Sequence, residues 1–206
     1  MKVKVTPSKV HGNVKIPASK SMAHRALICA SLSDGTSLVS NVTNSKDIEA
    51  TVGCMKALGA IIKQIDETTY EVTGTNLFKQ EGSITCNANE SGSTLRFLIP
   101  LAACTNAKVK FLGQGRLLQR PMDVYANEFK KQNIEFNQSD KEIIVSGNLQ
   151  AKDYVVQGDI SSQFITGFMF VLPLLDQDST LTITEPYESK SYVCLLYTSP
   201  SPRDRG

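Results

Sequence analysis

The sequence predicts an α/β domain made of three copies of one βαβαββ unit about a pseudo-threefold axis, the third copy being truncated. The first observation is a repeat: Ser91 lies 71 residues after Lys20, and Ser162 lies 71 residues after Ser91. The second is that each of these positions separates a short strand pattern from an apolar helical pattern. The third is the glycine and asparagine turns that punctuate the units.

The first two units show the full order of elements. In the first, alternation of apolar and polar residues predicts strands, and apolar residues at helical spacing predict helices. Its expected elements are strand 13–16, helix 22–32, strand 36–40, helix 45–58 and strands 60–65 and 69–73. The second unit is expected to hold strand 84–87, helix 94–104, strand 107–111, helix 121–131 and strands 134–137 and 142–146.

The third unit starts in the same way and then departs from the pattern. Strand 154–157, helix 164–175 and strand 180–184 are expected. From Cys194 to Gly206 the sequence has no helical period, and it resembles non-native adapter sequence. We therefore expect a domain over 1–193, in which strand 2–5 pairs into a missing second domain, and a non-native tail over 194–206. The truncation is expected to leave the apolar helix 164–175 uncovered and prone to aggregation.

The three apolar helices each begin at a serine-rich junction, which favours anion binding. Unpaired N–H groups and the positive end of the helix dipole gather at such junctions. A single junction is more often an ordinary cap, but the recurrence favours one shared pocket. Lys20 and Arg25 add cations, and Arg25 shares a helix face with Ser21. Gly92 allows a ligand to approach the backbone, and Arg120 supplies a further cation.

Composition excludes several classes of function. The chain has 206 residues, 41% of them hydrophobic, and a net charge of +2. Its basic residues are dispersed, which argues against nucleic-acid binding, and its apolar runs are too short to span a membrane, so we expect a cytoplasmic protein. Five scattered cysteines and two histidines, His11 and His24, favour neither a zinc site nor a disulfide framework. No metal is expected.

Five motifs together resemble those of the enolpyruvyl transferases. They are Pro17–Leu27, Glu90–Arg96, Arg116–Pro121, Gly158–Phe164 and Glu188–Tyr192. The resemblance implies one half of an inside-out α/β barrel pair that is a monomer when full length. It implies a transferase that joins phosphoenolpyruvate to shikimate 3-phosphate in aromatic amino-acid biosynthesis, without metal or organic cofactor. Both substrates are small polyanions.

The same resemblance implies the roles of individual residues. The residues implied to bind shikimate 3-phosphate are Lys20, Ser21, Arg25, Ser161, Ser162, Gln163, Ser189 and Tyr192. Those implied to bind phosphoenolpyruvate are Lys20, Gly92, Arg120 and Gln163. Gly92 is further implied to govern sensitivity to glyphosate. The catalytic acid and base are expected in the missing half, so the chain alone is expected to be inactive; Asp47 and Asp159 suit a helix start and a turn without catalysis.

Three alternatives stay open. The first is the UDP-N-acetylglucosamine enolpyruvyl transferase branch, which carries a cysteine where this chain has Gly115 and a Lys-Asn pair where it has Lys20-Ser21. Both differences favour the shikimate branch. The second is a non-catalytic anion-binding domain, and the third is an RNA-end-processing protein, which the lack of a basic aromatic face disfavours.

Overall fold

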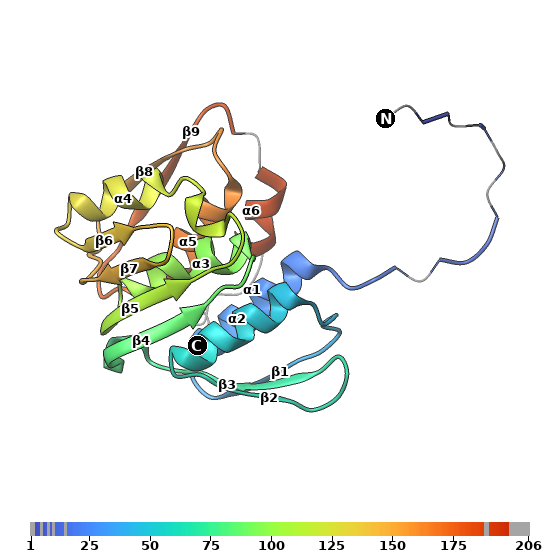
Figure 1. Ribbon diagram of the computed structural model, residues 1–206, viewed down its shortest axis with the longest axis horizontal. Coiled ribbons are helices and arrows are strands. Elements are labelled where there is room, and N and C mark those ends of the chain that lie inside the picture. The colour runs from blue at the N-terminus through green and yellow to red at the C-terminus, as the bar shows by residue number, and fades with distance from the viewer. Residues whose placement is uncertain are drawn as a thin grey trace.

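The structure is a computed structural model that describes residues 3–4, 6–7, 9, 11–14, 16–187 and 190–197. Its helices are α1 (Lys20–Leu32), α2 (Lys46–Ala57), α3 (Gly92–Ala102), α4 (Asp123–Lys130), α5 (Ser162–Val171) and α6 (Lys190–Tyr197), with short 3-10 helices η1 (Leu77–Lys79), η2 (Leu117–Gln119) and η3 (Leu172–Leu174). Its strands are β1 (Thr36–Val39), β2 (Ile61–Gln64), β3 (Tyr70–Thr73), β4 (Glu81–Asn87), β5 (Asn106–Leu112), β6 (Glu135–Gln138), β7 (Ile143–Ser146), β8 (Asp153–Gln157) and β9 (Thr180–Thr184). Three sheets lie around a central group of helices (Figure 1).

The second unit shows the complete predicted order. Its strands form the sheet β4-β5-β7-β6, in which β4 and β5 are parallel and the other pairs are antiparallel. Helix α3 connects the two parallel strands, and α4 precedes the β6–β7 hairpin. The βαβαββ unit predicted from the sequence is therefore confirmed here, and the mixed α/β fold with it.

The flanking units have fewer strands. The first forms the antiparallel sheet β1-β3-β2, and the third forms the parallel pair β8-β9. The strand predicted at 13–16 was wrong for the residues described there, because Val14 and Ile16 are 86% and 83% exposed and lie in no ladder. A four-residue alternation forms a strand only where a neighbour supplies hydrogen bonds. Of the strand predicted at 2–5, only residues 3 and 4 are described, and neither lies in a strand.

Serine caps begin all three central helices of the repeat. The hydroxyl oxygen of Ser19 accepts from the Met22 amide of α1 at 3.3 Å, and Ser91 does the same for Thr94 of α3 at 3.2 Å. Ser161 caps α5 by accepting from the Gln163 amide at 3.4 Å. Each hydroxyl satisfies one of the amides that a helix start leaves without a partner. The predicted junctions are thus confirmed as helix starts.

Helices α3 and α5 pack closely because of three residues. Pro100 lies inside α3 and has no N–H to donate to the Arg96 carbonyl one turn earlier. The hydroxyl of buried Tyr125 donates to that carbonyl instead, at 2.7 Å. A Cβ on Gly167 of α5 would collide with this hydroxyl, so the glycine permits the approach. Tyr125 therefore replaces the helical hydrogen bond that Pro100 removes.

Two predictions about the third unit were wrong. Helix α5 is covered: Phe164, Ile165, Phe168 and Val171 are all at most 5% exposed, since α3 and other core elements pack around them. Helix α6 continues to Tyr197, so the lack of helix expected from Cys194 onward was wrong for residues 194–197, whereas the domain boundary after Val193 stays a prediction. Residues 198–206 lie outside the described residues, so the non-native tail stays a prediction for them. In the part of the chain that is described, no helix has the length and apolar character to cross a membrane.

Candidate functional site

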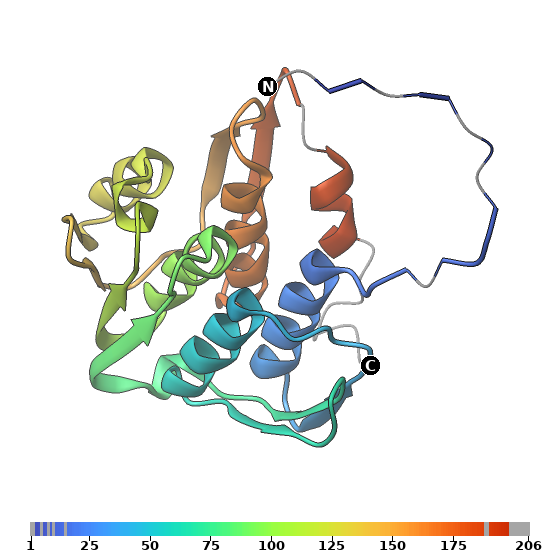
Figure 2. The same ribbon diagram turned by 45° about the vertical axis from the view of Figure 1, so that its right-hand side comes forward.

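The starts of α1, α3 and α5 open onto one pocket, which we call the amino-end pocket. Its volume is about 450 Å³. It is lined by Ser21, Arg25, Ser93, Arg96, Phe97, Arg120, Ser161, Ser162, Gln163 and Tyr192. Among the described residues that line it, three are arginines and none is acidic. In Figure 2, α1 (blue) and α5 (orange) run side by side in the middle of the molecule.

Arg25 is the most buried of the three arginines, with 4% of its surface exposed. Its guanidinium donates to the Ser21 carbonyl at 3.0 Å, to the Thr166 hydroxyl at 3.2 Å and to the Tyr192 carbonyl at 3.1 Å. The ring of Phe97 lies 5.2 Å away, and the Nε atom is buried with no partner. Burial lowers the Arg25 pKa, but a guanidinium stays charged at neutral pH. Arg25 thus joins α1, α5 and α6 and keeps one buried donor unpaired.

Arg96 and Arg120 form the second group of cations. The Arg96 guanidinium donates to Gln163 Oε1 at 2.8 Å, and its Nε is buried without a partner. Burial lowers the Arg96 pKa, and the positive charge of Arg120 lowers it further. A Cβ on Gly92 would collide with the Arg120 guanidinium, so the missing side chain makes room for that cation. Among the described residues neither guanidinium forms an ion pair with a carboxylate, and two such neighbouring positive charges favour an anion between them.

Lys20 does not line the amino-end pocket. Its ammonium pairs with the Asp47 carboxylate at 2.6 Å, and the Lys20 side chain is 56% exposed. Asp47 lies in the first turn of α2, where a carboxylate also favours the helix dipole. The pair links the starts of α1 and α2, and the substrate role implied for Lys20 requires its ammonium to turn a donor toward the ligand, beside Asp47 or in place of it.

A buried polar chain runs beside this pair. His24 Nδ1 and the Thr51 hydroxyl are 2.7 Å apart, Thr51 and Thr94 are 2.7 Å apart, and Thr94 donates to the Ser91 hydroxyl at 2.7 Å. His24 is 1% exposed and its Nε2 has no partner. Burial lowers the His24 pKa to about 4, so the ring is neutral at physiological pH. The chain connects α1 and α2 to the serine cap of α3.

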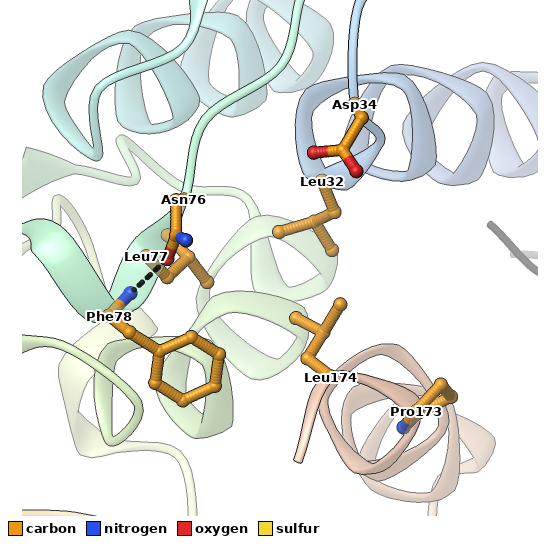
Figure 3. A pocket seen from close by; sticks show the side chains of 7 residues that line it. All are labelled: Leu32, Asp34, Asn76, Leu77, Phe78, Pro173 and Leu174. Atoms are coloured by element: carbon orange, nitrogen blue, oxygen red, sulfur yellow. Dashed lines mark hydrogen bonds between the residues drawn. The ribbon is translucent and has the colours of Figure 1, made fainter. Parts of the chain in front are cut away.

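A second pocket lies beyond the carboxyl ends of α1 and α5, and we call it the carboxyl-end pocket. Its volume is about 310 Å³, and it is lined by Leu32, Asp34, Asn76, Leu77, Phe78, Pro173 and Leu174. In Figure 3, Leu32, Phe78 and Leu174 point toward one another across the space. The Asn76 side chain accepts from the Phe78 amide at 3.0 Å. Its lining contains one carboxylate and no cation, so it does not suit an anion.

The structure brings together most of the predicted site residues. Ser21, Arg25, Ser161, Ser162, Gln163, Tyr192 and Arg120 line the amino-end pocket, and Gly92 adjoins it. Ser189 lies outside the described residues, and Asp159 is exposed in a turn. The prediction missed Ser93, Arg96 and Phe97. The 71-residue repeat could have found Arg96, because it is the position that corresponds to Arg25.

Comparison with known proteins identifies the family of the chain. The model of the family EPSP synthase (3-phosphoshikimate 1-carboxyvinyltransferase) matches residues 5–198. The chain belongs to the EPSP synthase family. Among solved structures, an EPSP synthase from Acinetobacter baumannii superposes with a TM-score of 0.74 at 19% identity, covering 88% of this chain and 42% of that one. The likeness confirms the EPSP synthase fold.

Curated relatives are named 3-phosphoshikimate 1-carboxyvinyltransferase. The protein of Clostridium perfringens (strain SM101 / Type A) is 47% identical over 196 residues, which is 94% of this chain and 46% of the relative. The protein of Clostridium kluyveri is 48% identical over 93% of this chain and 45% of the relative. The protein of Clostridioides difficile is 46% identical over 96% of this chain and 47% of the relative. The chain thus spans about half the length of these EPSP synthases.

Proposed function

We propose that the amino-end pocket binds shikimate 3-phosphate and phosphoenolpyruvate for transfer of the enolpyruvyl group to shikimate 3-phosphate. The observation that carries this proposal is the convergence of three helix starts and three arginines on one pocket whose described lining holds no acidic residue. Both ligands carry phosphate and carboxylate groups, which such donors recognise. The names of the relatives supply the reaction.

The implied residue roles fit this geometry and stay proposals. For shikimate 3-phosphate, the pocket lining includes Ser21 and Arg25 of α1, Ser161 and Ser162 at the start of α5, and Tyr192 of α6. For phosphoenolpyruvate, the Arg120 guanidinium lies over Gly92 and close to Gln163. The arginines and helix starts of this pocket would neutralise the phosphate groups and orient the two substrates. Neither role needs a proton transfer.

Lys20 can join this site at little energetic cost. An exposed ion pair contributes only about 0–1 kcal/mol, so its ammonium can exchange Asp47 for a substrate phosphate. Release of Asp47 would leave that carboxylate near the bound ligand. We therefore expect Lys20 to contribute to affinity less than Arg25, whose guanidinium is already fixed in the pocket.

Calorimetric titration of the chain tests the ligands. We expect heat of binding with shikimate 3-phosphate that weakens as salt is raised, and no saturable binding of UDP-N-acetylglucosamine or a short RNA. Binding of the nucleotide sugar in place of shikimate 3-phosphate would move the chain to the other enolpyruvyl transferase branch. Binding of all phosphates with equal affinity would indicate an anion-binding domain without substrate specificity.

A chimera tests the transfer reaction. This chain would replace the matching segment of the Clostridium kluyveri relative, with which it is 48% identical. We expect the chimera to release phosphate from phosphoenolpyruvate only when shikimate 3-phosphate is present. A soluble, folded chimera without turnover would contradict the proposed function. A cytoplasmic location and a monomeric state stay predictions.

A further inference from the structure

We propose that Arg96 is a positioning residue that holds the Gln163 amide in one orientation, so that Gln163 presents an N–H donor to an anion in the amino-end pocket. The inference rests on the proposed function and deepens it, because it names a residue that acts on the ligand through another side chain.

The Gln163 amide has a partner at each end. Arg96 Nη1 donates to Gln163 Oε1 at 2.8 Å, and Gln163 Nε2 donates to the Ser93 hydroxyl at 2.8 Å. A guanidinium has only donors, so it selects the amide orientation that turns the carbonyl oxygen toward it. Ser93 cannot make this selection, because a hydroxyl both donates and accepts. The orientation of Gln163 is therefore set by Arg96.

Arg96 is itself held in place on several sides. Its guanidinium lies over the Phe164 ring at 4.8 Å, and Phe164 is the residue that follows Gln163 in α5. Its carbonyl accepts from Tyr125, the donor that compensates for Pro100. Backbone and side chain of Arg96 are thus both fixed before a ligand arrives, which is what a positioning residue requires.

The fixed amide matters for an anionic ligand. With Oε1 bound to Arg96 and one hydrogen of Nε2 bound to Ser93, the amide nitrogen keeps one hydrogen for a ligand. In the opposite orientation the NH₂ group would face the Arg96 donors, and the carbonyl oxygen would be free to repel a carboxylate or phosphate. Arg96 excludes that orientation, so Gln163 enters binding already arranged.

The first test needs no ligand. Solvent exchange of the Gln163 side-chain NH₂ is measured by NMR in the 206-residue chain, with exposed Gln177 as the reference. We expect Gln163 to exchange more slowly than Gln177, and Arg96→Met to accelerate Gln163 exchange about tenfold through loss of one charged hydrogen bond. Arg96→Lys, which keeps a donor, should restore part of the protection. Unchanged exchange in a folded Arg96→Met chain would overturn the proposal.

The second test is a double-mutant cycle on the affinity for phosphoenolpyruvate. Arg96→Met should weaken binding about tenfold in the parent chain and by a clearly smaller factor when Gln163 is already alanine, where only the loss of the Arg96 charge remains. Arg116→Met is the charge control, because exposed Arg116 lies outside the pocket lining. An equal loss in both backgrounds would show that Arg96 contacts the ligand directly and would overturn the positioning role.

The two tests separate the inference from the proposed function. If the parent chain binds neither phosphoenolpyruvate nor shikimate 3-phosphate, the proposed function fails, while the exchange rates still decide whether Arg96 orients Gln163. If the parent binds and the cycle is additive, the proposed function stands and the positioning role fails.

Discussion

The two ends of the central helices carry pockets of comparable volume but opposite chemistry. The amino-end pocket has three arginines and three capped helix starts, whereas the carboxyl-end pocket has three leucines, a phenylalanine and Asp34. Helix polarity accounts for part of the difference, because the positive dipole ends point to one side only. The repeat accounts for the rest, since it places the same polar junction on that side three times. A cavity therefore becomes an anion site through the direction of its helices and the placement of its cations.

The largest expected effect concerns the buried polar chain at the amino end. The His24 pKa is about 4 in the folded chain and near 6.5 when unfolded, so the unfolded chain binds the proton more tightly between these values. The contribution of neutral His24 to the free energy of unfolding is fully present above about pH 6.5. It should fall by up to about 3 kcal/mol as the pH approaches 4. Urea unfolding at pH 7 and pH 4.5 measures it.

His24→Gln is the control for this prediction, because it keeps polar atoms near Thr51 without a titrating ring. Carboxylates titrate in both chains, so only the difference between their pH dependences belongs to His24. If the free energy of unfolding depended on pH in the same way in both chains, neutral His24 would contribute nothing to stability.

Removal of Arg25 should have the next largest effect, on ligand binding. Arg25→Met is expected to weaken shikimate 3-phosphate binding by about 2 kcal/mol, the scale of a charged hydrogen bond. Since Arg25 also joins α5 and α6, unfolding of the variant must be measured beside the titration. Arg25→Lys should weaken shikimate 3-phosphate binding less than Arg25→Met does. An unchanged affinity in a folded Arg25→Met chain would contradict the role of Arg25 as the main cation of the amino-end pocket.

Substitution of Gly92 should have a smaller and more selective effect. The methyl group of Gly92→Ala meets the Arg120 guanidinium, which must move away from its position over the backbone. We expect a loss of about 1 kcal/mol in phosphoenolpyruvate affinity and less in shikimate 3-phosphate affinity. Titration with each ligand separates the two, and equal losses would contradict the assignment of Gly92 and Arg120. An inhibition curve with glyphosate for a Gly92→Ala version of the active chimera tests the implied sensitivity.

The smallest effect is expected at the carboxyl end. Asp34→Asn removes the carboxylate of that pocket while leaving every arginine in place. The change in shikimate 3-phosphate affinity should stay below about 0.3 kcal/mol, because a charge at the far helix ends is largely screened by solvent and salt. A change as large as that of Arg25→Met would mean that the two ends are not independent.

Local signals made the helices and their starts predictable. Serine caps and apolar periodicity are properties of a few neighbouring residues, and the repeat positions Lys20, Ser91 and Ser162 lie within one residue of the capping serines Ser19, Ser91 and Ser161. The strand at 13–16 failed because strands depend on a partner that periodicity does not reveal. The sequence did not indicate α6, whose residues Val193 and Leu196 pack on the core on both sides of the boundary drawn after Val193.

Contacts between distant segments were not predictable from the sequence. Lys20 and Asp47 are 27 residues apart, and nothing in either segment indicates that they pair. The link between Arg96 and Gln163 spans 67 residues and depends on how closely α5 approaches α3. That approach requires Gly167 and Tyr125 together. The predicted site thus contained several motif residues and missed Arg96, which lies in the motif Glu90–Arg96 but whose contact with Gln163 depends on the packing of α3 on α5.

An NMR titration of the chain with shikimate 3-phosphate tests most directly whether the amino ends form the anion site. We predict that backbone amide signals shift at Ser21, Ser93 and Ser162, in the first turns of α1, α3 and α5, and stay unchanged at Asp34, Phe78 and Leu174 around the carboxyl-end pocket. Shifts gathered at the carboxyl-end pocket, or at one helix start without the other two, would contradict the account.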